Sequence, residues 1–258
     1  GQDNVIEGVW PDRVIHRVER AELHSFHCRD ARAAAIVYAG GGYLALMYDK
    51  EGVEIALWLN SIGIDAHVLV HRLPGGAHAG GRFAKDVALI DGLAAVDLVG
   101  RMTPELPLLH VGLSSGGHLA GCLAAHYPAA WGDVAPQRPD VMVIGYAPIS
   151  TNAKGRTIVA DKPPLPPVEK QALYDALQPD AQLRPGPPPA FIVYAGNDPV
   201  VPVENAHRLD RAWQDAGGSA ELHIFADAPH GFALDTQDQP VSLWPRLCEA
   251  WLRQVGFL

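Results

Sequence analysis

Six short apolar runs, separated by helical stretches, constrain the fold of this chain more than any other feature. They lie at residues 34–38, 66–70, 106–113, 141–146, 191–195 and 221–225. Continuous apolar runs of this length, bounded by glycine or proline, are typical of strands that are buried on both faces of a parallel sheet. The sequence therefore predicts an α/β fold with a mostly parallel central sheet.

Amphipathic stretches between these runs predict helices that flank the sheet. In the stretch 51–62, apolar side chains recur at i, i+3, i+4 and i+7, and Gly63 follows as a stop signal. Further helices are predicted at 83–99, 116–127, 204–216 and 243–255. Strand and helix thus alternate through short connections, which indicates βαβ units with right-handed crossovers.

One segment interrupts this alternation. Residues 148–189 contain 10 of the 22 prolines and show the pattern of only one short helix, near 168–177. A long irregular insertion in a compact domain is either functional, for example as a partial lid, or a rigid surface excursion. We expect a single domain over residues 1–258 that carries this insertion.

Composition excludes several classes of protein. The chain of 258 residues is 48% hydrophobic, so it can bury a large core, and its formal net charge of −9 argues against a nucleic-acid partner. No apolar run reaches the roughly 18 residues that a transmembrane helix needs. Three cysteines suit neither a disulfide framework nor a zinc ribbon. Gly1 without an initiator Met indicates removal of a tag or a signal peptide, and the compartment and oligomeric state stay open.

The pentapeptide 112–116, Gly-Leu-Ser-Ser-Gly, has the pattern G-x-S-x-G between a predicted strand and a predicted helix. Glycines two residues before and after Ser114 permit a tight turn that lifts the serine hydroxyl above the sheet. The N-terminus of the following helix favours developing negative charge at that point. These features predict that Ser114 is a nucleophile.

A serine nucleophile needs a base, and the base needs an orienting acid. Asp198 follows the run 191–195, and His230 follows the run 221–225, at the sheet edge where open α/β folds place their sites. The chain order is therefore Ser114, Asp198, His230. Asp227 is the nearest competing acid, but it lies only three residues before His230 and is too close to supply a separate loop.

Three successive glycines after the run 34–38 predict the remaining part of the site. Glycine lets the backbone approach a ligand closely, so the N–H groups of Gly41 and Gly42 can serve, with that of Ser115, as an oxyanion hole. Tyr43 and Leu44 follow the glycines and Tyr146 ends the run 141–146. We expect these three side chains to line a shallow acyl pocket. This chemistry requires no metal and no cofactor.

These motifs resemble those of α/β-hydrolase esterases of the acetyl-xylan-esterase-like and lipase/esterase-like group. The matching stretches lie at residues 40–43, 56–64, 112–120, 197–205, 230–232 and 244–252. The resemblance covers about residues 34–258 and implies the α/β-hydrolase fold, a triad of Ser114, Asp198 and His230, and donors at Gly41, Gly42 and Ser115. Ala39 stands where relatives carry His or Pro, which leaves every backbone donor in place.

Together these observations predict a serine carboxylic-ester hydrolase. Its expected substrates are short-chain acyl esters, with acetyl esters of carbohydrates as one candidate class, and its expected partner is a small-molecule or carbohydrate ester. Two alternatives stay open, because one fold hosts many functions. The first is an amide hydrolase or peptidase with the same triad, and the second is a non-catalytic binding protein with the hydrolase fold.

Overall fold

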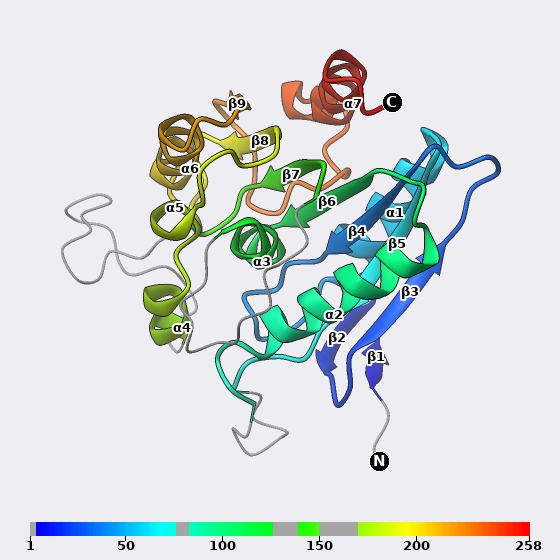
Figure 1. Ribbon diagram of the computed structural model, residues 1–258. Helices are drawn as coiled ribbons and strands as arrows, with labels where there is room; N and C mark the ends of the chain where they lie inside the picture. The colour runs from blue at the N-terminus through cyan, green and yellow to red at the C-terminus, as the bar shows by residue number, and fades with distance from the viewer. Residues whose placement is uncertain (1–3, 76–82, 126–138, 150–169) are drawn as a thin grey trace.

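The computed structural model describes residues 4–75, 83–125, 139–149 and 170–258. Within them a seven-stranded sheet has the order β3-β5-β4-β6-β7-β8-β9, and only β3 pairs antiparallel (Figure 1). The strands are β3 (Glu22–Phe26), β4 (Ala33–Tyr38), β5 (Ile64–Val70), β6 (Leu108–Leu113), β7 (Val141–Gly145), β8 (Ala190–Ala195) and β9 (Ala220–Phe225). The predicted mostly parallel α/β fold is confirmed.

Burial follows the position of each strand in the sheet. Every residue of β4, β7 and β8 is buried, because helices cover both faces of these central strands. The edge strand β9 mixes exposed and half-buried residues and carries Glu221 and His223. Five of the six apolar runs are therefore strands largely buried on both faces, whereas the run 221–225 is the edge strand β9, so the prediction that this run is buried on both faces is wrong.

Helices lie on both sides of the sheet. They are α1 (Glu54–Ser61), α2 (Val87–Met102), α3 (Ser115–Ala124), α4 (Gln171–Ala176), α5 (Pro179–Gln182), α6 (Glu204–Asp215) and α7 (Trp244–Gln254). Helices α2, α3 and α6 cover one face, and α1 and α7 cover the other (Figure 1). The Trp58 ring of α1 packs edge-on against the Trp244 ring of α7, with ring centroids 5.2 Å apart.

The structure adds elements that the sequence did not predict. A two-stranded antiparallel sheet of β1 (Val5–Glu7) and β2 (Val14–Arg17) precedes β3. The predicted helix at 51–62 is a π-helical turn, Tyr48–Val53, that continues into α1. Of the proline-rich insertion, residues 150–169 lie outside the described residues, so the hypothesis of a partial lid stays a prediction; the predicted short helix is α4.

Close backbone packing positions the turn between β6 and α3. A methyl group at Gly116 would overlap the carbonyl oxygen of Tyr38 in β4, and one at Gly112 would overlap the backbone of Gly116. Both positions therefore require glycine for the approach of α3 to the strands beneath it.

We expect Gly116→Ala to lower the free energy of unfolding by about 3 kcal/mol, because the added methyl group must displace the β4 backbone. Urea denaturation measures this loss. Gly196→Ala is the matched control, since its new methyl group would meet its nearest neighbour at an ordinary 3.5 Å. A Gly116→Ala protein as stable as the control would contradict this account of the packing.

Candidate active site

Ser114 lies at the turn between β6 and α3, with φ of +51° and ψ of −126°. This left-handed conformation is costly for a residue with a side chain, and such strain clusters at functional sites. The Ser114 N–H donates to the Gly145 carbonyl oxygen at 2.9 Å, which ties the turn to β7. The turn places Ser114 in the wall of a cavity of about 510 Å³.

His230 and Asp198 extend from Ser114 in a continuous chain of hydrogen bonds. The Ser114 Oγ lies 3.0 Å from His230 Nε2, and His230 Nδ1 lies 2.7 Å from Asp198 Oδ2. Asp198 Oδ1 accepts the backbone N–H groups of Val200 and Val201, each at 2.8 Å. With the Nδ1 proton donated to Asp198, Nε2 is free to accept a proton from Ser114.

The competing acid takes a different place. Asp227 Oδ1 accepts a hydrogen bond from Asn197 Nδ2 at 2.6 Å, on the exposed side of the loop. The Asp198 side chain is fully buried and faces the imidazole. The structure thus brings together the three residues that the sequence singled out and leaves Asp227 outside their hydrogen-bonded chain.

The glycine loop lies beside Ser114. Gly41 and Gly42 line the cavity and have φ of +132° and +64°, and the Gly41 carbonyl oxygen accepts the N–H groups of Leu44 and Ala45 at 3.1 Å. Ser115 is the first residue of α3, where helix hydrogen bonding leaves the backbone N–H groups unused. The loop and the helix N-terminus can therefore present N–H groups to an anion in the cavity.

Glu51 also lines this cavity, and the sequence did not single it out. Glu51 Oε2 accepts the Gly40 N–H at 2.7 Å, and Oε1 accepts the Tyr146 hydroxyl at 2.9 Å. Burial raises the pKa of Glu51, while these two hydrogen bonds oppose that rise. The sequence signal was weak, because a Glu at the start of a predicted helix is usually a solvated residue of the first turn.

Tyr43 does not line the cavity, contrary to the prediction from the sequence. Its side chain is buried, and its hydroxyl lies 2.8 Å from His118 Nδ1, while His118 Nε2 lies 2.7 Å from the Leu177 carbonyl oxygen. Burial lowers the pKa of His118 to about 4, so the neutral ring donates through Nε2 and accepts from Tyr43. The buried hydrogen-bond partner holds Tyr43 in the core.

Leu44 and Tyr146 also lie outside the lining of this cavity. Leu44 is 48% exposed on the surface, and Tyr146 is fully buried beneath Glu51, with its ring edge-on to the His230 ring at 5.3 Å. Other side chains form the wall in their place: Met47, Pro148, Tyr174, Val200 and Val201. Most of this wall is apolar, which suits the hydrocarbon part of a ligand.

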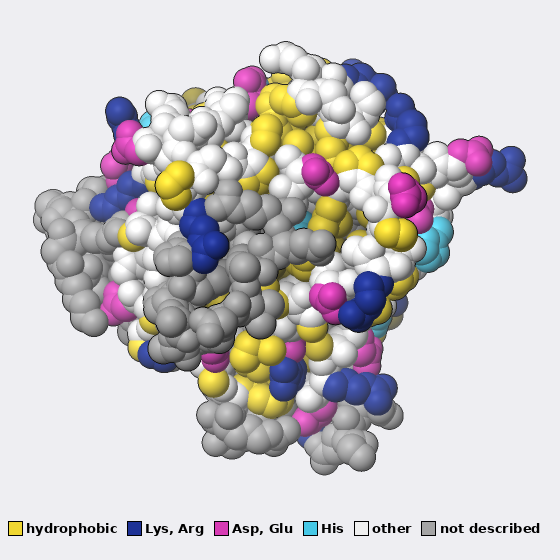
Figure 2. All heavy atoms as spheres, viewed as in Figure 1, with side chains coloured by type: hydrophobic (Ala, Val, Ile, Leu, Met, Phe, Trp, Pro, Cys, Tyr) yellow, Lys and Arg dark blue, Asp and Glu magenta, His cyan; other side chains and the backbone are white. Residues whose placement is uncertain are grey.

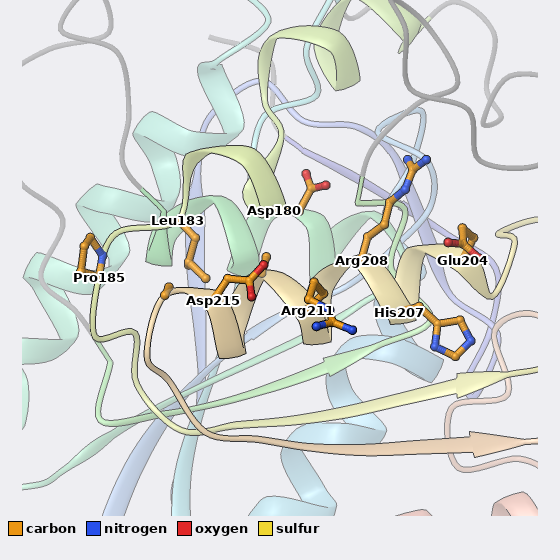
Figure 3. Close-up of a pocket in the computed structure, with 10 residues that line it drawn as sticks. Asp180, Leu183, Pro185, Glu204, His207, Arg208, Arg211 and Asp215 are labelled. Atoms are coloured by element: carbon orange, nitrogen blue, oxygen red, sulfur yellow. The ribbon is translucent and has the colours of Figure 1, made fainter.

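A second hollow, of about 990 Å³, lies between α5 and α6 (Figure 3). Acidic and basic side chains both face it: the carboxylates of Asp180, Glu204 and Asp215, the guanidinium groups of Arg208 and Arg211, and the imidazole of His207. None of the predicted catalytic residues lines it.

Charges of both signs are also interspersed on the molecular face in Figure 2, so that face shows no uniform basic surface for phosphates.

Two sequence comparisons bear on the site. Residues 176–258 match the model of the dienelactone hydrolase family. The chain is 29% identical over 148 residues to endo-1,4-beta-xylanase B of Butyrivibrio fibrisolvens, a match that covers 53% of this chain and 22% of that protein. The chain thus spans only about a fifth of the length of this curated relative.

Solved structures match over nearly the whole chain. An acetyl ester-xyloside bifunctional hydrolase from Caldicellulosiruptor lactoaceticus is 28% identical, with a TM-score of 0.72 over 92% of this chain and 89% of that chain. The chain has the α/β-hydrolase fold. Two further structures share this fold at lower identity. Thermogutta terrifontis esterase 2 is 21% identical, with a TM-score of 0.75 over 92% of this chain and 91% of that chain. Carboxylesterase Cest-2923 from Lactobacillus plantarum is 19% identical, with a TM-score of 0.73 over 99% and 98%.

The resemblance that the sequence motifs indicated is therefore confirmed. Within its described residues, this α/β-hydrolase has no helix that is both long and apolar enough to cross a membrane. Nor does that part of the chain hold a group of three or more His, Cys, Asp or Glu side chains arranged as metal ligands.

Proposed function

We propose that this α/β-hydrolase is a serine carboxylic-ester hydrolase in which Ser114, His230 and Asp198 form the catalytic triad. The observation that carries the proposal is the hydrogen-bonded chain from Ser114 Oγ through both ring nitrogens of His230 to Asp198. Its first two members open onto the cavity, and its last is buried. This is the arrangement that a hydroxyl nucleophile, its base and an orienting acid require.

The reaction then runs in two halves. Ser114 Oγ attacks the ester carbonyl carbon while His230 Nε2 accepts its proton, and the N–H groups of Gly41, Gly42 and Ser115 stabilise the oxyanion. The intermediate collapses, His230 donates the proton to the leaving alcohol, and an acyl-serine remains. Water, deprotonated by His230, releases the acid and restores Ser114. Asp198 orients the ring and stabilises its charged form throughout.

The proposed substrates are short-chain acyl esters, with acetyl esters of carbohydrates as the first candidates. A cavity of about 510 Å³ with a largely apolar wall has room for an acyl group and part of the alcohol. The C. lactoaceticus hydrolase is described as acting on an acetyl ester and a xyloside, and the B. fibrisolvens relative is a xylanase. Both names favour an alcohol of the plant-polysaccharide type.

Ser114→Ala tests the proposal directly. We expect kcat for 4-nitrophenyl acetate to fall on the order of 10³-fold or more, with loss of the acyl-enzyme burst, because the nucleophile is gone. Ser61→Ala is the matched control, since its hydroxyl donates only to the Trp58 carbonyl oxygen at the end of α1. Turnover near the wild-type level in Ser114→Ala would rule out this nucleophile.

Comparing the hydrolysis rates of an acetyl ester and of the matching anilide separates an esterase from an amidase.

Asp198→Asn and Asp227→Asn form a matched pair that tests the acid. We expect Asp198→Asn to lower kcat on the order of 10⁴-fold, because an amide no longer holds the required imidazole tautomer. Asp227→Asn is expected to leave kcat within about 3-fold of the wild-type value, which corresponds to a change below about 1 kcal/mol in the activation barrier. Steady-state kinetics on both variants shows which of the two aspartates orients His230. The reverse pattern would make Asp227 the catalytic acid.

Acyl-chain selectivity tests the proposed substrate class. Each methylene that finds apolar volume gains roughly 0.8 kcal/mol, whereas one that meets the wall gains nothing. We expect kcat/KM for 4-nitrophenyl esters to be highest at about two to four acyl carbons and to fall beyond about six. A flat profile from acetate to octanoate, or a maximum at octanoate, would contradict the short-acyl proposal.

A further inference from the structure

We infer that Glu51 is a positioning residue that ties the glycine loop and the His230 loop into one catalytic unit. The inference rests on the proposed function. Two loops from opposite sides of Ser114 converge on this carboxylate: Gly40 belongs to the loop after β4, and Tyr146 to the loop after β7. Glu51 itself lies in the π-helical turn before α1 and is only 4% exposed.

The Gly40 contact holds the loop that carries the proposed oxyanion donors. A methyl group at Gly40 would overlap Glu51 Oε2 and would lie 2.6 Å from Ser114 Cβ, so the Gly40 backbone is packed between the carboxylate and the nucleophile. Once the Gly40 N–H is fixed, the next two residues, Gly41 and Gly42, are fixed relative to Ser114. Preorganised donors of this kind need no rearrangement when the oxyanion forms.

The hydrogen bonds from Gly40 and Tyr146 to Glu51 form what we call the Glu51 clamp. The Tyr146 contact extends this clamp to the His230 loop. Tyr146 has φ of +35°, and its ring packs edge-on against His230 at 5.3 Å and against Phe232 at 4.5 Å. Its hydroxyl donates to Glu51 and accepts the Ala233 N–H at 3.3 Å. One hydroxyl therefore joins the carboxylate to the loop that bears the base.

Only a carboxylate satisfies both donors. The Gly40 N–H and the Tyr146 O–H each need an acceptor, and ionised Glu offers two oxygens without a donor of its own. Glutamine would accept one donor and turn its NH₂ group toward the other. The chain keeps a carboxylate here although burial disfavours its charge, which points to function more than to stability.

The charged neighbours of Glu51 leave the clamp intact. Lys50 directs its ammonium to Asp235 at 3.0 Å and Asp12 at 3.3 Å. His230 is the cation that lowers the Glu51 pKa when its ring is protonated, and Tyr146 is the other titratable group in contact. Glu51 thus stays hydrogen-bonded to the Gly40 N–H and the Tyr146 hydroxyl, and His230 becomes a cationic neighbour only while it carries the proton taken from Ser114.

The first test compares Glu51→Gln with wild type on 4-nitrophenyl acetate. We expect kcat to fall about 10- to 100-fold, because small displacements of catalytic groups have costs of this size. KM is expected to change less than about 3-fold, because the apolar wall is unaltered. Asp91→Asn is the matched control, since Asp91 is also 4% exposed and accepts hydrogen bonds from Arg72. This control should lose stability and keep kcat.

The second test uses Tyr146→Phe, which removes one arm of the clamp and leaves Gly40 bound to Glu51. We expect a smaller fall in kcat, about 3- to 10-fold, and we expect the double variant to lose no more kcat than Glu51→Gln alone, because Glu51→Gln already breaks the link to Tyr146. If Glu51→Gln does not fold, the kcat of Tyr146→Phe alone tests the link between Glu51 and the His230 loop. An unchanged kcat in Tyr146→Phe would overturn the link to the His230 loop.

The pH dependence of stability tests whether Glu51 is held in the folded protein as a buried carboxyl group with a raised pKa. Glu51 has a raised pKa in the folded protein, so its contribution to stability is full below its unfolded value of about 4.5 and is lost as pH rises through the folded value. Glutamine does not titrate. We therefore expect the unfolding free energy of Glu51→Gln, relative to wild type, to shift in favour of the variant between pH 4 and pH 7.

The outcomes separate this inference from the proposed function. Full kcat in a folded Glu51→Gln, with Ser114→Ala inactive, overturns the positioning role alone. Wild-type activity in Ser114→Ala overturns the proposed function. A fall in kcat at unchanged KM, together with the expected pH shift in relative stability, supports the clamp.

Discussion

The approach of α3 to the strands at Gly112 and Gly116 is the constraint on which the rest of the site depends. These glycines let the helix begin directly above the sheet, with Tyr38 of β4 in contact beneath it. The turn this creates forces Ser114 into its left-handed conformation and turns the hydroxyl into the cavity. Every other group of the site is then positioned relative to this one turn.

Loops from the carboxyl ends of parallel strands supply those other groups. Gly41 follows β4, Tyr146 follows β7, Asp198 follows β8 and His230 follows β9. Because neighbouring parallel strands end at the same edge, residues far apart in the chain meet without a long excursion of the backbone. A rigid sheet with helices on both faces thus holds a site made largely of loop residues.

The sequence predicted the parts of this arrangement that have local signals. Continuous apolar runs marked the central strands, and the glycine spacing around Ser114 marked the turn, so the placement of Asp198 and His230 followed from chain order. The strands β1, β2 and β3 were missed because they are short and partly exposed and lack such runs. Glu51 was not singled out, and Tyr43 was placed wrongly in the cavity wall, because buried hydrogen bonds to residues 95 and 75 positions away determine their orientations.

Two kinds of group line the cavity, backbone groups and side chains. Gly41 and Gly42 contribute backbone to it, whereas Met47, Pro148, Val200 and Val201 contribute the side chains of its apolar wall. Backbone donors persist whatever side chains surround them, so the shape of the wall can diverge while the polar centre is retained. A lineage of such proteins, or a directed-evolution experiment, can therefore explore new ligands by substitution at the wall while the groups around Ser114 stay the same.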